Sequence, residues 1–360
     1  MAQDEEKLGT RLVDINTEFL LPLPDGYAIS QNVGEPENLR ANLKCIVPHA
    51  FETTCTGKNA ELCQLSAIDE TGVEIFSEYI LPLGTVRYAA SRVGKLSVRA
   101  INGEKRLCKE NQPVDAISLE QALQRFLAFL VNVKRGLNME PLTILIGHNF
   151  SIFDTPILLR KSNVEFHSKQ KELNVNFADS QILVKHLIKE KHRALQLSSG
   201  NFCKSNQSSL YSHLFQEEFE AHDSLEDVKA LQKILFTSSL QLSKEKIVNY
   251  SSVTNVCQAV DSMLYFDQRQ EILQTFNGRL FNSDDDNGVI KQSMALNIAG
   301  TGISYSDLCE LYTKFGKKGL LAILSMPPSQ SDLKRLRVTR TKRILGAIAY
   351  HLKREIPPEE

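Results

Sequence analysis

Three short and widely separated motifs contain the residues of this chain that could perform metal-dependent chemistry. They are ETT at residues 52–54, HNFSIFD at residues 148–154 and HDSLED at residues 222–227. Carboxylate oxygens are the ligands that Mg²⁺ prefers in proteins, and histidine is the side chain that most often accepts a proton during catalysis. These residue types fit a site in which carboxylates hold a divalent metal ion and a histidine activates water.

The first motif has a gap at the position two before Glu52, where the residue is Ala50. Side chains alternate along a strand, so Glu52 shares a face with Ala50, whereas His49 and Phe51 point to the opposite face. His49 is therefore a poor substitute for a missing ligand. Pro48 is a second irregularity, because proline removes a ladder hydrogen bond from a central strand.

The third motif fits the start of a helix. Asp223 and Glu226 have the spacing of a capping box, so the helix is expected to begin at Ser224, with His222 in the loop before it. Helix geometry places Asp227 on the same side as the apolar residues that follow it. A carboxylate on a buried face is unfavourable unless it is paired or holds a metal ion.

The elements that would position these motifs follow from hydrophobic periodicity and turn residues. Residues 43–52, 61–69 and 73–80 are expected to form a meander of three strands, and the apolar run at 142–146 indicates a strand buried on both faces. We expect a helix at 118–133 entered through Ser118, and another that begins at Pro156 with Thr155 as its N-cap. A strand and a helix follow at 175–191, and residues 192–209 are read as a loop. Residues 84–114 show no clear period.

The bulk composition is that of an ordinary globular protein. The 360 residues have a formal net charge of -1, so no overall field attracts the chain to nucleic acid. The seven cysteines form no C-x-x-C pair and are read as reduced thiols, and neither a secretion signal nor a long apolar segment is evident. We therefore expect no membrane span and an intracellular location, nuclear or cytoplasmic.

Three regions are predicted: an irregular leader at residues 1–40, an α/β domain at 41–240 and a helical accessory domain at 241–360. SYSD at residues 304–307 resembles a capping box, so the apolar residues after it are expected to form core. The basic run RVTRTKR at residues 337–343 could contact a phosphate backbone, act as a nuclear-targeting patch or form a solvated helix face, of which the last is the commonest case. SDDDNG lacks EF-hand spacing and is read as a loop.

The order and spacing of the motifs resemble the DEDDh branch of the DnaQ-like 3′-to-5′ exonucleases, which have a ribonuclease H-like fold. The resemblance covers about residues 43–238 and includes Asp179-Ser180 in the strand between the second and third motifs. The whole chain also resembles animal exonuclease-like proteins related to the terminal domain of the promyelocytic leukaemia protein, some of which have a similar helical tail. This implies a mixed five-stranded sheet flanked by helices.

The resemblance also implies roles for individual residues. By position, Glu52, Asp154 and Asp227 correspond to ligands of two Mg²⁺ or Mn²⁺ ions, one of which activates water while the other stabilises the leaving oxygen. His222 corresponds to the general base.

Four further residues correspond to the nucleic-acid side of the family site. Thr53 and Thr54 would lie near the terminal nucleotide, with backbone amides that contact it. His148 and Asn149 are candidates for nucleic-acid binding, although a turn that satisfies backbone groups is an equal alternative.

The departure from the family pattern is Ala50, which replaces the aspartate that bridges both ions. The loss of such a ligand is expected to lower the rate by at least about 10²- to 10³-fold and could reduce the bound ions to one or none. The alanine could mark a natural pseudoenzyme, a deliberate inactivation, or a site in which water or a neighbouring acid partly substitutes.

Three hypotheses remain at the level of sequence. The first is a metal-dependent 3′-to-5′ exonuclease domain that acts on the 3′ ends of DNA or RNA with weak or absent activity. The second is a catalytically silent module that binds nucleic acid or a protein partner through the same cleft and the helical tail. The third is an interaction scaffold that uses the tail. The sequence distinguishes neither DNA from RNA nor one oligomeric state from another.

Overall fold

The structure is a computed structural model that describes residues 44–135, 142–151, 154–282, 288–325 and 338–356. The expected leader at 1–40 and most of SDDDNG lie outside these residues, as does Arg337 of the basic run. The described residues form two compact units, one that ends at Met263 and one that begins at Leu264. The first unit thus continues beyond residue 240, where the sequence placed the boundary.

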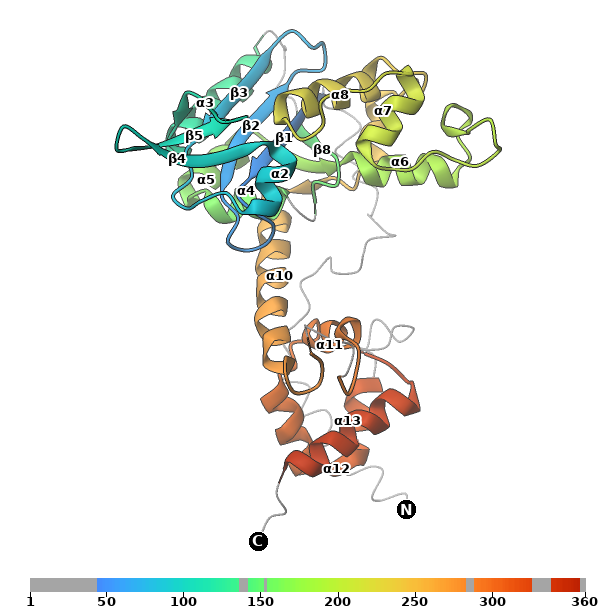
Figure 1. Cartoon of the computed structure of the whole chain (residues 1–360). Helices are drawn as coiled ribbons and strands as arrows, with labels where there is room; N and C mark the ends of the chain where they lie inside the picture. The colour runs from blue at the N-terminus through green and yellow to red at the C-terminus, as the bar shows by residue number, and fades with distance from the viewer. Residues whose placement is uncertain (1–43, 136–141, 152–153, 283–287, 326–337, 357–360) are drawn as a thin grey trace. The chain divides into compact units, whose positions relative to one another are not determined.

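A mixed sheet forms the centre of the first unit (Figure 1). β1, β2 and β3 make an antiparallel meander, and β8 and β9 continue the sheet in parallel on the other side of β1. These five strands are the predicted ones, and the predicted α/β fold with a mixed sheet flanked by helices is confirmed. Two-residue strands extend both edges, so that the order is β10 (Thr254–Asn255), β9 (Val175–Asp179), β8 (Leu142–Gly147), β1 (Lys44–Thr53), β2 (Leu62–Ile68), β3 (Ile75–Ile80) and β7 (Ala116–Ile117).

Helices cover both faces of this sheet because its strands present apolar side chains on both sides. One face packs against α3 (Leu119–Val133), α4 (Asp154–Lys161) and α5 (Val164–Glu172), in a core that contains Phe51, Phe126 and Phe150. The other packs against α6 (Ser180–Lys189), α7 (Gln207–Phe215), α8 (Ser224–Phe236) and α9 (Lys244–Tyr250), around Ile46, Ile144 and Ile146. The two cores hold the central strands fixed.

Local sequence signals placed some helix ends correctly and others not. Ser118 is the N-cap of α3 as expected, and it forms a capping box with Gln121. Helix α4 begins at Asp154 and not after Thr155, because the backbone N–H groups of Asp154 and Thr155 already donate to the carbonyl of Phe150. The segment predicted as a loop at 192–209 contains a 3₁₀ turn (Arg193–Leu195) and the first turn of α7.

Residues 84–114, for which the sequence showed no period, form an ordered insertion between β3 and β7. It contains α2 (Tyr88–Gly94) and a small antiparallel sheet of β4 (Leu96–Ile101), β5 (Glu104–Lys109) and β6 (Gln112–Pro113). Leu96 and Leu107 pack on Cys63 of β2 as a separate small cluster. In β4 and β5 buried and exposed residues do not alternate, so these strands show no period of their own.

The second unit is a group of helices with its own apolar core. α10 (Val256–Phe276) contributes its last turns, and α11 (Gln292–Ala299), α12 (Tyr305–Ser325) and α13 (Lys342–Glu355) complete it. Ser304 and Asp307 form the expected reciprocal cap of α12, and the apolar residues behind them pack in the core as predicted. A non-helical backbone at Gly316 breaks α12 into two parts.

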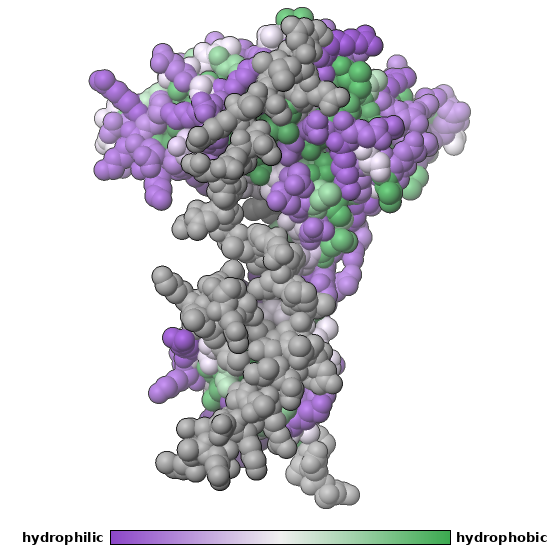
Figure 2. All heavy atoms as spheres, turned by 180° about the vertical axis from the view of Figure 1, so that it is seen from behind, coloured by the Kyte–Doolittle hydropathy of each residue, from purple (hydrophilic) through white to green (hydrophobic). Residues whose placement is uncertain are grey.

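On the face shown in Figure 2, the visible described residues are mostly hydrophilic, with smaller hydrophobic areas between them. Within these residues, no helix has both the length and the apolar composition that a membrane span requires. All seven cysteines are free of disulfide bonds.

Candidate active site

Strand β1 delivers Glu52 because it changes partners along its length. Residues up to Pro48 pair with β8, and residues from His49 onward pair with β2. Pro48 thus lies at the junction of two ladders, where a residue without an N–H donor is best accommodated. The proline is therefore compatible with the central position of β1.

The two faces of β1 separate as the alternation of side chains predicts. The fully buried ring of His49 packs against Phe150, with ring centroids 3.9 Å apart, and lies beside Phe51. Burial lowers the pKa of His49 to about 3, so this ring is neutral near pH 7. Glu52 and Ala50 occupy the other face, which packs against α8, so His49 contributes nothing to that side.

Helix α8 delivers Asp227, and it begins at Ser224 as predicted. Its N-cap is Asp223, whose carboxylate accepts hydrogen bonds from the backbone N–H groups of Leu225 and Glu226. Strand β2 fixes this helix start, because Gln64 accepts from the Ser224 N–H at 3.3 Å. Since Gln64 lies opposite Glu52 in the β1–β2 ladder, the ends of β1 and α8 are tied together through one side chain.

Asp154 stands at the start of α4, after a turn that Asp179 organises. The buried Asp179 carboxylate accepts hydrogen bonds from the N–H groups of Asn149 (3.0 Å) and Ser151 (3.1 Å), and from the Ser151 hydroxyl. It also caps α6 through the Gln181 N–H. The Asp179 side chain thus holds both the turn before Asp154 and the start of α6.

The three carboxyl groups share a poorly solvated and electronegative environment. Burial, followed by the charges of Asp227 and Asp154, raises the pKa of Glu52 to about 8. Burial, with Asp179 and Asp227 next, raises the pKa of Asp154 to about 8. Burial also raises the pKa of Asp227 to about 7, against the effect of a backbone hydrogen bond from His222. A cation placed among these groups would favour their charged forms.

The chemistry of this donor set fits a hard divalent cation, since carboxylate oxygens suit Mg²⁺ and Mn²⁺. Among the residues that the structure describes, no three His, Cys, Asp or Glu side chains lie close enough together to hold one ion as they stand. An ion held by all three carboxylates would therefore require them to lie closer together. Ala50 lies on the same face as Glu52 and has no oxygen to add.

His222 lies in the loop before α8, as predicted, and its backbone is left-handed, with φ of 70°. Its side chain is exposed to solvent, whereas its backbone N–H donates a hydrogen bond to the Asp227 carboxylate. The imidazole is thus free to meet a ligand that enters from outside.

The four candidate nucleic-acid residues are held by internal hydrogen bonds. The hydroxyl of Thr53 donates to the Cys55 carbonyl at 2.9 Å, and the hydroxyl of Thr54 accepts from the Glu61 N–H at 3.0 Å. Both ring nitrogens of His148 have partners, the Ser180 hydroxyl at 2.9 Å and the Ser205 carbonyl at 2.7 Å. Asn149 uses its N–H on Asp179. In this arrangement His148 and Asn149 stabilise the turn before Asp154.

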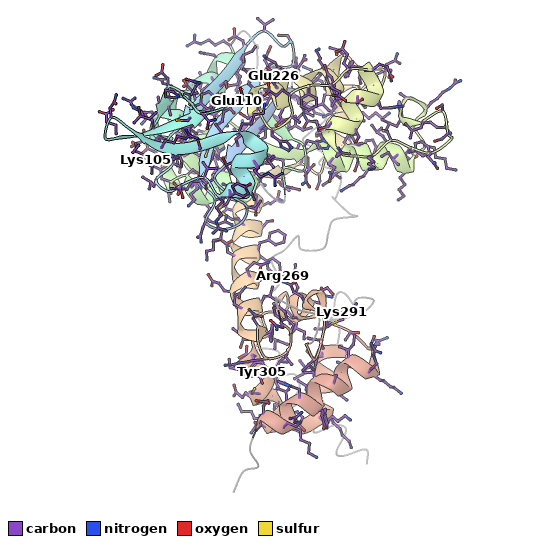
Figure 3. The ribbon with its side chains drawn as sticks, in the orientation of Figure 1. Lys105, Glu110, Glu226, Arg269, Lys291 and Tyr305 are labelled. Atoms are coloured by element: carbon purple, nitrogen blue, oxygen red, sulfur yellow. The ribbon has the colours of Figure 1, made fainter. Side chains whose placement is uncertain are left out.

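The insertion lies beside the site, which the sequence did not indicate. A Cβ atom added at Gly94 would stand 2.8 Å from Oε2 of Glu52, so the end of α2 touches this carboxylate. Lys109 of β5 forms an ion pair with Asp223, the cap of α8. Lys95 reaches Glu220 of the loop before His222 at 2.8 Å. Figure 3 shows Lys105 and Glu110 on the insertion and Glu226 on α8.

Comparison with known proteins gives one family match and several distant structural likenesses. Residues 286–355 match the family model described as PML, C-terminal domain. A search among curated proteins found no match.

The solved structures that resemble the chain include the zinc-bound complex of Escherichia coli exonuclease I with single-stranded DNA. Its identity is 15%, its TM-score is 0.39, and the match covers 63% of this chain and 44% of that one, so this chain spans less than half of its length. Exonuclease I with a dT13 oligonucleotide matches at 12% identity and a TM-score of 0.42, over 88% of this chain and 76% of the other. A 3′-exonuclease that recognises a histone mRNA stem-loop matches at 13% identity and a TM-score of 0.37, over 53% of this chain and 61% of the other. These likenesses are distant.

Proposed function

We propose that residues 41–240 form a metal-dependent 3′-to-5′ exonuclease domain directed at the 3′ ends of DNA or RNA, with residues 241–360 as a helical accessory domain. The observation that supports this most directly is the group of Glu52, Asp154 and Asp227, which come from three separate elements and whose pKa values are all raised. Structural ion pairs would lower these values. Perturbed carboxylates without a basic partner are typical of sites that bind cations.

In this proposal the three carboxylates hold Mg²⁺ or Mn²⁺, with two ions in a complete site and one or none where Ala50 stands. The bound ion supplies charge stabilisation and an activated water for hydrolysis of a phosphodiester. His222, which is exposed at the site, accepts the proton of the attacking water. Thr53, the last residue of β1, and Thr54 directly follow Glu52 and are the proposed neighbours of a terminal nucleotide. Both backbone groups of Thr54 already have partners, the Glu61 carbonyl and the Arg87 N–H, so Thr54 would contribute no free amide.

A second candidate function follows from Ala50 itself. Without the bridging carboxylate, the same cleft could bind nucleic acid or a protein partner and leave it uncut, and the helical tail could add to such contacts. The two candidates differ in one measurable property, because only the first requires metal-dependent loss of nucleotides from a 3′ end.

The deciding experiment measures Mn²⁺-dependent shortening of a 5′-labelled single-stranded oligonucleotide by the wild type and by Ala50→Asp. We expect the Asp variant to cut at least about 10²-fold faster, since one charge-stabilising group typically contributes that much. Asp227→Asn in the Ala50→Asp background is the control and should abolish the gain. If Ala50→Asp is folded and shows no cutting in Mn²⁺, the nuclease proposal is wrong and the binding module remains.

A further inference from the structure

The insertion at residues 84–114 has a charge unlike that of the whole chain. It contains seven basic and two acidic residues, whereas the chain as a whole has a net charge of -1. Most of the basic side chains are exposed, and Lys95 and Lys109 contact Glu220 and Asp223 beside the carboxylate site. Local basic charge next to an acidic site is what a polyanionic ligand requires if it is to approach the carboxylates.

Helix α2 of the insertion is fixed to the first motif at both of its ends. The N–H of Arg87, its N-cap residue, donates to the carbonyl of Thr54 at 2.9 Å. At the other end, Gly94 is close to the Glu52 carboxylate. The helix therefore lies across the ETT segment, next to the Glu52 carboxylate.

The outer surface of α2 has the two groups that bind single strands. Tyr88 is 78% exposed, which is unusual for a large aromatic side chain. Arg92 lies over its ring, 5.9 Å from the centroid, on the next turn of the helix. Among the described residues, neither Arg87 nor Arg92 forms an ion pair, and both are exposed. A base can stack on an aromatic ring, and guanidinium groups donate hydrogen bonds to phosphate oxygens.

We propose that α2 is a docking surface for single-stranded nucleic acid, on which Tyr88 stacks a base and Arg87 and Arg92 contact the phosphate backbone. This inference deepens the proposed function, on which it rests, because it specifies an unpaired strand as the ligand of that site. Tyr88 and Gly94 are six residues apart, hence about 9 Å along the helix. At about 3.4 Å per stacked nucleotide, the base on Tyr88 is within about three nucleotides of Glu52.

The rest of the insertion holds this surface in place. Lys109 forms an ion pair with Asp223, and Lys95 forms one with Glu220. These pairs anchor the insertion to the loop and helix that contain His222 and Asp227. Arg87 and Arg92 are not used in this way. A strand bound on α2 is therefore held at a fixed position relative to the three carboxylates.

The test measures binding without hydrolysis, by fluorescence anisotropy of a labelled dT15 strand in EDTA. We expect Tyr88→Ala to weaken binding about 5- to 100-fold and Tyr88→Phe to retain it, because stacking needs only the ring. Arg87→Gln with Arg92→Gln should make the slope of log affinity against log salt shallower by about 1.4, the value for two lost phosphate contacts to a single strand. Lys171→Gln on α5, at the opposite face of the sheet, is the charge control, and its affinity for dT15 should fall only as the loss of one surface charge predicts. Tyr88→Ala should weaken binding by the same factor in the presence and absence of this control substitution.

The outcomes separate this inference from the proposed function. If Tyr88→Ala binds dT15 as the wild type does, or if the wild type does not bind dT15 at 50 mM salt, the docking surface is refuted even where nuclease activity is found. If Tyr88→Ala loses binding while no variant cuts, the docking surface stands and the nuclease proposal fails. If Tyr88→Ala lost as much affinity for a blunt duplex of the same sequence, the docking surface would also be refuted, since a paired base cannot stack on Tyr88.

Discussion

The replacement of Glu52 by glutamine is expected to stabilise the metal-free protein at alkaline pH. Burial and two neighbouring carboxylates raise the pKa of Glu52 from 4.5 to about 8. Between these values the unfolded chain releases the proton and the folded chain keeps it, so the free energy of unfolding of the wild type falls as the pH rises through this window. The glutamine side chain of the variant has no proton to release, so the free energy of unfolding of the variant does not fall in this window.

The size of the effect follows from the shift. One pKa unit corresponds to about 1.4 kcal/mol, so the full shift amounts to about 5 kcal/mol. Asp154 and Asp227 titrate in the same range, and the penalty belongs to the three groups together. Glu52 is also partly exposed. We therefore expect Glu52→Gln to raise the free energy of unfolding by about 2 to 3 kcal/mol at pH 8.5 and by less than about 1 kcal/mol at pH 5.

The assay is urea unfolding in EDTA at these two pH values, repeated at pH 8.5 with Mn²⁺. Mn²⁺ should stabilise the wild type more than the variant, because an ion that binds only the folded state adds about 2.7 kcal/mol at one hundred times its dissociation constant. Glu78→Gln, at an exposed ion pair with Arg125, serves as the control and should show no such pH dependence. If Glu52→Gln is no more stable than the wild type at pH 8.5 in EDTA, the account of the site as an uncompensated carboxylate group is wrong.

Two further changes test the contacts of the insertion. Lys109→Gln removes the ion pair with Asp223 and should lower the free energy of unfolding by about 1 to 3 kcal/mol near pH 7. Burial opposes the shift, but the hydrogen bonds from Lys109 and the backbone lower the pKa of Asp223. The stability difference between wild type and variant should therefore be present above about pH 4 and disappear as Asp223 is protonated at lower pH. A stability difference that persists in acid would contradict this ion pair as its cause. Gly94→Ala, made together with Ala50→Asp, should leave the melting temperature unchanged or slightly raised, since alanine favours a helix, yet reduce cutting about 10-fold or more because the new methyl group displaces the Glu52 carboxylate. Gly346→Ala in α13, which meets no atom within 4 Å, is the matched control, and equal activity of the two variants would show that the contact with Glu52 is irrelevant.

The sequence predicts the parts of the site that depend on local periodicity. The alternation of β1 placed Glu52 and Ala50 on one face and His49 on the other, and helix geometry placed Asp227 on the inner side of α8. The five predicted strands were found because their sequences are apolar or alternate, which β4 and β5 do not do.

The parts that depend on contacts between distant residues could not be predicted. The hydrogen bonds of Asp179 to Asn149 and Ser151 join segments that no local pattern relates. The contact of Gly94 with Glu52 depends on how the insertion packs. Its basic composition was visible in the sequence, but it becomes informative only when the insertion is seen beside three carboxylates.

The change of partners at Pro48 also protects the alignment of the strand during folding. A slip of β1 by one residue would turn Glu52 toward the aromatic core of Phe51 and Phe150 and expose the apolar set to the opposite helix layer. A slip that draws residue 48 into the β2 ladder would leave that ladder without a donor, because proline has no N–H. A misaligned strand is therefore disfavoured twice, and the proline that looks like a flaw in a central strand helps to select the pairing in which Glu52 faces Asp227.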